Sequence, residues 1–123
     1  MVVWDDGSEQ HEAPFSEADL EELVSRLDGR NRTLVTLFVG EGHAACGGDA
    51  RTGLVVYVTL DGERFHQLVR GDRGGDGEVA VVAGGQLGDY PARSVVSAER
   101  AIEALRWYVD HHELMPSAEW ETS

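Results

Sequence analysis

The stretch from Asp89 to Trp120 constrains the fold more than any other part of the chain. Directly after Ser97, residues suited to a buried surface recur at the three-, four- and seven-residue intervals of one helical face. They are Ala98, Ala101, Ile102, Leu105, Tyr108, Val109 and His112. At 100° per residue they span about 120° of arc, which is wide enough to cover a sheet. We therefore predict a long amphipathic helix that packs on a sheet formed by the preceding residues.

Both ends of this predicted helix carry recognisable signals. Ser97 is a good N-cap because its hydroxyl can accept hydrogen bonds from the first free backbone N–H groups. Glu99 follows in the first turn, where the helix dipole favours an anion. Pro116 has no N–H to donate, so we predict that the helix ends there.

A shorter amphipathic helix is predicted near the N-terminus. Ser16 begins it, with Asp19 as a capping-box partner, and Gly29 is suited to its C-terminal end. Its apolar stripe is Leu20, Leu23, Val24 and Leu27.

Strands are predicted before and between the two helices. Thr33–Val39 is apolar and β-branched, which is typical of a central strand buried on both faces. Asp61-Gly62 is a strong hairpin signal, and Gly47–Gly53 and Gly71–Gly77 are predicted loops. The remaining predicted strands are Val2–Trp4, His43–Cys46, Leu54–Leu60, Glu63–Val69 and Glu78–Ala83. The predicted fold is α+β, a single domain over residues 1–123 in which an antiparallel meander carries an N-terminal and a C-terminal helix on one face.

The chain is strongly acidic, with a net charge of −13, and all ten of its basic residues are arginines. Eight acidic residues and no basic one fall within the first 22 positions. Such a field repels nucleic acid and attracts a basic protein, so we expect no direct nucleic-acid binding. The alternative interpretation is that the acidity only keeps a small protein in solution.

Two surface features are candidate contacts for a protein partner. The first is the polar side of the N-terminal helix, which carries Glu17, Asp19, Glu21 and Glu22. Glu17 and Glu21 repel each other at i,i+4 spacing, and a face that keeps a repulsion points to a partner. The second is Trp107, which falls about 180° from Ala98 on the helical wheel, opposite the predicted buried stripe. Either the C-terminal tail covers Trp107, or its indole is an exposed interface residue.

No set of residues has the spacing of a catalytic or metal site. His112-Glu113 begins like the helix of a zinc protease, but Pro116 stands where the second histidine is required. No serine, histidine and acid can be grouped from their spacing. We therefore predict a protein that is not an enzyme, with no metal site and no cofactor.

The lone cysteine, Cys46, has no partner for an internal disulfide and suits a reducing compartment. No run of residues approaches the roughly 20 apolar positions of a membrane span, and no signal peptide is recognisable. We expect a cytoplasmic protein that does not associate with membranes.

The chain resembles family one of the immunity proteins, which guard bacteria against their own polymorphic toxins. The resemblance covers most of the chain and is tightest over Tyr90–Trp120. The matching features are Trp4, Gly71-Asp72 after a hairpin, the Pro91 bend, the helix entry Ser97–Ala101, Ala104-Leu105, Tyr108, Pro116 and Trp120.

The resemblance implies a small α+β protein that binds and blocks a cognate toxin without catalysis. Toxins paired with this family include nucleic-acid deaminases and nucleases, and an acidic inhibitor suits an enzyme with a basic cleft. Two alternatives stay open: an acidic adaptor or regulatory module with no toxin partner, and a small-molecule-binding domain.

Overall fold

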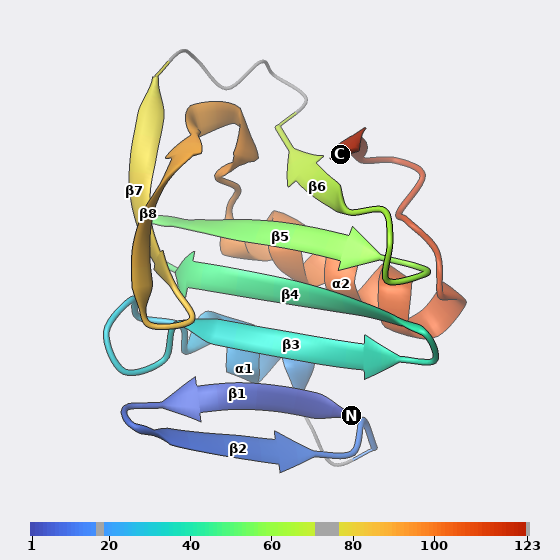
Figure 1. The fold of residues 1–123 in the computed structure, drawn as a ribbon, viewed down its shortest axis with the longest axis horizontal. Helices are drawn as coiled ribbons and strands as arrows, with labels where there is room; N and C mark the ends of the chain where they lie inside the picture. Colours follow the sequence, from blue (N-terminus) through green and yellow to red (C-terminus); the bar gives the residue numbers. More distant parts are fainter. Residues whose placement is uncertain (17–18, 71–76, 123) are drawn as a thin grey trace.

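The computed structural model describes residues 1–16, 19–70 and 77–122, which fold into an antiparallel sheet with helices on one face and a two-stranded ribbon on the other (Figure 1). Within these ranges the larger sheet, called the main sheet below, has seven strands in the order β2-β1-β3-β4-β5-β6-β9. Its strands are β1 (Val2–Asp6), β2 (Glu9–Ala13), β3 (Leu34–Val39), β4 (Gly42–Asp49), β5 (Gly53–Thr59), β6 (His66–Val69) and β9 (Glu119–Thr122).

The centre of the main sheet follows the apolar sequence pattern. Val35, Cys46 and Val56 lie opposite one another on β3, β4 and β5, and all three are buried on the helix side. The expectation that Thr33–Val39 is buried on both faces is wrong for the other side, where Phe38 is 47% exposed. Side chains alternate across a strand, so the β3 side chains on the helix side are buried, whereas those on the opposite side are only partly covered.

Strand β4 is longer than its sequence suggests, because the predicted loop Gly47–Gly53 is largely part of the sheet. Gly47 pairs with Leu34 and Val55, and Gly48 pairs with Leu54. A Cβ on Gly47 would lie only 2.5 Å from the Cβ of Ala83, so this glycine allows another element to pack directly on the sheet.

The outermost strands of the main sheet were not predicted. Strand β2 is the polar segment EQHEA, which pairs with β1 through the Gly7 turn, and β9 comes from the C-terminal tail and pairs with β6. Both edge strands carry exposed glutamates, which discourage another chain from adding to the sheet.

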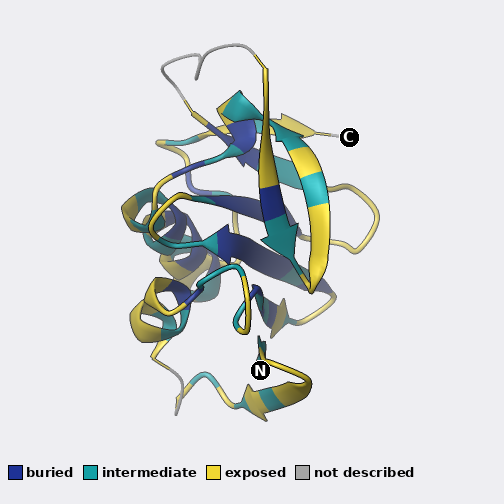
Figure 2. Cartoon of the chain, turned by 90° about the vertical axis from the view of Figure 1, so that its left-hand side faces the viewer, coloured by how far each residue is buried: buried dark blue, intermediate teal, exposed yellow. Residues whose placement is uncertain are grey.

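Strands β7 (Glu78–Ala83) and β8 (Gln86–Pro91) form the separate two-stranded ribbon. The strand predicted at Glu78–Ala83 is confirmed, and the predicted break at Gly84-Gly85 is its hairpin turn, with φ of +62° and +78°. A short 3₁₀ turn, η1 (Ala92–Ser94), follows. The ribbon stands on the side of the main sheet opposite the helices (Figures 1 and 2).

The described residues contain two α-helices, α1 (Leu20–Ser25) and α2 (Ala98–His111), as the predicted class requires. In Figure 1 both lie behind the main sheet. The first helix is shorter than expected, because α1 spans only six residues, and two strands precede it where one was predicted. It begins at Leu20, where Asp19 rather than Ser16 is the N-cap. It ends at Ser25, four residues before Gly29.

Helix α2 confirms the predicted N-cap and corrects the helix end. The Ser97 hydroxyl accepts from the backbone N–H of Arg100 at 3.2 Å. The helix stops at His111, because His112 adopts a left-handed conformation with φ of 55°, so Pro116 lies beyond the end.

The buried face of α2 is rotated from the predicted stripe. Its buried residues are Ala101, Ala104, Leu105 and Tyr108. Ala98, Ile102 and Val109 are half-buried, whereas His112 is exposed. Ala104 was not predicted to be buried, so the helix presents a face closer to Trp107 than the spacing of apolar residues indicated.

Candidate functional site

The acidic residues predicted to face a partner have roles within the chain itself. Asp19 caps α1 by accepting from the Glu22 backbone N–H at 3.1 Å. Glu21 binds Arg106 of α2 at 3.0 Å, and Glu22 forms an ion pair with Arg26. Glu17 lies outside the described residues. The side chains of both ion pairs are about half exposed, and such surface pairs contribute only about 0–1 kcal/mol each.

A hollow of about 480 Å³ lies beside these acids, between the two helices and β1. Phe15 and Leu20 give it an apolar floor, while Asp19, Arg106 and Asp110 bring both signs of charge. The α1–α2 surface therefore combines carboxylates with arginines, and is less acidic than the run of carboxylates in the sequence.

Trp107 is half-buried and packs against the core. At 100° per residue it lies only about 60° from the buried Ala104. Arg100, on the same side of α2, donates to the carbonyl oxygen of Ser117 at 3.0 Å, so the tail runs along this side. The indole stacks on His111 with ring centres 3.9 Å apart, and its Nε1–H is buried without a hydrogen-bond partner among the described residues.

Of the two interpretations offered for Trp107, this environment favours coverage by the chain. Met115 of the tail is buried in the core cluster against which Trp107 packs. The helical wheel placed Trp107 directly opposite the predicted stripe, whereas the buried face of α2 includes Ala104 and lies closer to Trp107.

A second surface, which the sequence reasoning missed, lies on the face of the main sheet away from the helices. Phe38, His43, Tyr57 and Phe65 form an aromatic group there, called the ring cluster below. The ring centre of His43 lies 5.9 Å from that of Phe38, 5.6 Å from Tyr57 and 6.0 Å from Phe65. Tyr57 and Phe65 are 5.7 Å apart.

The strand register explains how the ring cluster forms. Phe38 and His43 are direct partners across β3 and β4, and Ala45 pairs with Tyr57 across β4 and β5. Residues two apart share a face, so all these side chains point away from the helices. The alternation in Thr36, Phe38, His43, Ala45 and Tyr57 was the available signal, but Thr33–Val39 had been interpreted as uniformly buried.

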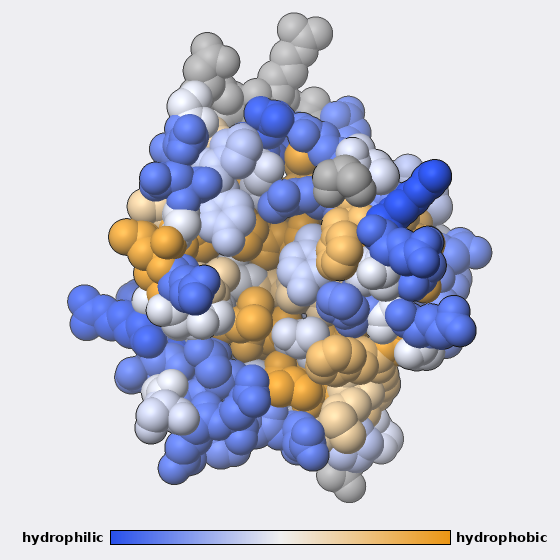
Figure 3. All heavy atoms as spheres, viewed as in Figure 1, coloured by the Kyte–Doolittle hydropathy of each residue, from blue (hydrophilic) through white to orange (hydrophobic). Residues whose placement is uncertain are grey.

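The β7–β8 ribbon covers the other half of this sheet face. A small cavity of about 140 Å³ lies between the ribbon and the main sheet, lined by Leu34, Ala45, Tyr57, Ala83 and Tyr90 among others. Figure 3 looks onto this face and shows apolar residues in a central hollow with hydrophilic residues around it. The main sheet therefore has one face covered by helices and one face only partly covered.

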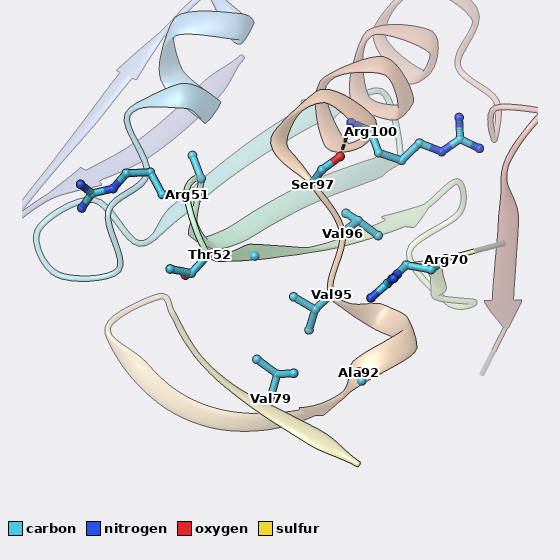
Figure 4. A pocket seen from close by; sticks show the side chains of 11 residues that line it. Arg51, Thr52, Arg70, Val79, Ala92, Val95, Val96, Ser97 and Arg100 are labelled. Carbon is cyan, nitrogen blue, oxygen red and sulfur yellow. Dashed lines mark hydrogen bonds between the residues drawn. The ribbon is translucent and has the colours of Figure 1, made fainter. Parts of the chain in front are cut away.

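A hollow of about 680 Å³ lies where η1 leads into α2, and three arginines line it: Arg51, Arg70 and Arg100. They do not converge on one point, because Arg51 and Arg100 extend away from the hollow on opposite sides (Figure 4). Arg100 is also bound to the Ser117 carbonyl. The arrangement is not that of a built anion site.

The described residues offer little reactive chemistry. No three His, Cys, Asp or Glu side chains in residues 1–16, 19–70 and 77–122 gather in a way that could hold a metal ion. Cys46 is buried, and burial raises the pKa of its thiol to about 12, so the reactive thiolate is scarce at neutral pH. Within the same ranges, no helix has the length and apolar character needed to cross a membrane.

Comparison with known proteins identifies a family. Residues 9–122 match the family described as Immunity protein Imm1, which is nearly the whole chain. A search of curated proteins gave no match. The matched range includes every strand of the main sheet except β1, together with the ribbon and both helices. The chain therefore belongs to the Imm1 family of immunity proteins.

Proposed function

We propose that this immunity protein neutralises a toxin domain that acts on nucleic acid, as a deaminase or a nuclease does, by covering the toxin's basic surface. The observation that carries the proposal is a net charge of −13 on 123 residues. An enzyme that binds nucleic acid must present positive charge to phosphates, and an acidic protein complements that charge.

The acidic N-terminal third acts mainly by steering the toxin toward the complex. Internal pairs reduce the field of Glu21 and Glu22 but leave the net charge of the whole protein unchanged. At physiological salt, charges act over about 8 Å, so a partner feels the acidic surface before contact. We propose Glu17, Asp19, Glu21 and Glu22 as steering residues, with Trp107 as a candidate contact at the edge of α2.

The immunity role requires the protein to work where the toxin would act on the producing cell, so we propose a cytoplasmic location. An adaptor with no toxin partner would share the acidity, and the neighbouring gene distinguishes the two roles. A small-molecule-binding domain is less well supported, because the hollows of about 480 and 680 Å³ are open and the arginines that line the second do not converge on one point (Figure 4).

Co-expression tests the proposal directly. The C-terminal domain of the protein encoded beside this chain is expressed alone and together with the full-length immunity protein. We expect the domain alone to stop growth and co-expression to restore it, with both proteins recovered as one complex. The control is an immunity protein from a different toxin locus, which should not restore growth. A toxic neighbour that is neither rescued nor co-purified would contradict the proposal.

A further inference from the structure

The exposed apolar surface of the described chain is concentrated at one end of the main sheet. Six large apolar side chains are exposed in the described ranges: Met1, Phe38, Leu60, Phe65, Val79 and Leu87. Met1 pairs with Phe38 through the backbone in both directions, at 2.9 and 3.2 Å. Leu60 and Phe65 lie in the loop between β5 and β6, and Phe65 contacts the ring cluster. Four of the six therefore lie at this end of the main sheet, and two of them, Phe38 and Phe65, belong to the ring cluster, which no described element covers.

The two loops next to these rings carry carboxylates. The β3–β4 turn carries Glu41, and the β5–β6 loop carries Asp61 and Glu63 against one arginine, Arg64. Backbone N–H groups of Arg64 and Glu63 lower the pKa of Asp61, so it stays ionised at neutral pH. The side chains of Glu41 and Glu63 have no partner among the described residues.

Aromatic faces bordered by unpaired carboxylates suit a cation that also has apolar surface. An arginine or lysine side chain meets this requirement, because its stem packs on rings while its charge interacts with their faces and with nearby carboxylates. A purely apolar partner would bury Glu41 and Glu63 without compensation, which costs free energy.

We propose that the ring cluster is the anchor site for the toxin and receives an arginine or lysine side chain from its basic surface. This inference rests on the proposed function and names the surface that carries it. The carboxylates on α1 act at longer range, whereas the ring cluster supplies the buried contact. The ribbon bounds the site on the other side and limits the approach to one part of the sheet face.

Paired substitutions test the anchor. A Phe38→Ala/Phe65→Ala variant of the full chain is titrated with the catalytically inactivated toxin domain encoded beside it. We expect affinity to fall by about 30-fold or more, the loss typical of a dominant interface contact. The melting temperature is measured in parallel, because both rings are more than a third exposed and the variant should stay folded. Tyr57→Phe keeps the ring and should bind like the parent protein.

A second pair tests the cationic occupant. Phe38→Leu/Phe65→Leu keeps apolar surface but removes the aromatic faces, and we expect affinity to fall about 5-fold or more. Glu41→Arg/Glu63→Arg should weaken binding further, because it repels the cation. If the leucine variant and the arginine variant both bind like the parent, the occupant is not cationic and the inference fails.

The outcomes separate this inference from the proposed function. If the parent protein does not bind the toxin domain, the proposed function fails. If the parent binds and the folded alanine variant binds equally well, the toxin docks elsewhere and only the inference fails. If the free protein is a dimer that the alanine variant dissociates, the rings hold a second copy of this chain and the inference is overturned.

Discussion

The two faces of the main sheet differ in whether their carboxylates are already bound within the chain. On the covered face, Glu21 and Glu22 bind Arg106 and Arg26, and Asp19 caps α1. On the partly open face, the ring cluster has no covering element, and Glu41 and Glu63 have no partner in the described part of the chain. The covered face carries the denser run of acidic residues in the sequence, but fewer of its carboxylates are free to bind a partner.

The number of carboxylates on a face therefore differs from the number that are free to bind a partner. A carboxylate held by an arginine or a helix end must lose that contact before it can bind a partner closely. An unpaired carboxylate beside exposed rings loses only water. The covered face is therefore expected to control stability and long-range attraction, and the open face to control affinity.

The largest predicted loss of stability that tests this comparison is on the covered face. Leu105→Ala should lower the free energy of unfolding by about 2–5 kcal/mol, because it leaves a cavity between α2 and the main sheet. Arg106→Ala, one residue further on, should cost about 0.5 kcal/mol or less, since its ion pair with Glu21 is more than half exposed. Chemical denaturation measures both, and similar costs would show that the helix face is wrongly placed.

A carboxylate used in the fold should behave differently from one at the border of the rings. Asp5 accepts from the Thr33 backbone N–H at 2.7 Å and from the Leu34 N–H at 2.9 Å. Asp5→Ala leaves these donors without a charged acceptor and should cost about 1.5–3 kcal/mol of stability. Glu63→Ala is the matched control and should change stability by less than about 0.5 kcal/mol. Equal losses in urea unfolding would contradict the distinction.

Trp107 tests whether the edge of α2 belongs to the fold or to the interface. Trp107→Ala should cost about 2 kcal/mol of stability, roughly half the cost of a fully buried aromatic, because the indole is half-buried. If the tail covers it, toxin affinity measured below the melting temperature should be unchanged. A stable variant that loses more than about 2 kcal/mol of binding free energy would place Trp107 in the interface.

The smallest effect concerns steering. Glu17→Gln, Asp19→Asn, Glu21→Gln and Glu22→Gln are combined, and asparagine at position 19 keeps the ability to cap α1. We expect slower association with the toxin at low salt and a weaker dependence on salt, with little change in dissociation. A variant with glutamine at Glu99, Glu103, Glu113 and Glu119 has the same net charge. If it slows association equally, only net charge matters and the N-terminal acids have no special role.

Local apolar patterns predicted the centre of the molecule. Leu34–Val39, Gly53–Thr59 and Glu78–Ala83 form strands close to the predicted ranges, and Ser97 caps α2 as expected. In these segments, burial and local propensity favour the same structure.

The edges and the candidate anchor were missed for a different reason. Strand β2 is polar and depends on β1 for its hydrogen bonds, and β9 depends on β6, from which it is far away in sequence. The ring cluster combines residues from β3, β4, β5 and the following loop, so it requires the correct register of three strands. Register is decided by long-range pairing, which the spacing within one segment does not reveal.

The burial of Cys46 makes this protein convenient to label. It is the only cysteine in the sequence, it lies between the main sheet and the helices, and its thiol is shielded from reagents in solution. A cysteine introduced at the exposed Leu87, on the ribbon beside the open face, would therefore be the only readily modified thiol. A fluorescent dye attached there would report toxin arrival at that face without first removing the native cysteine.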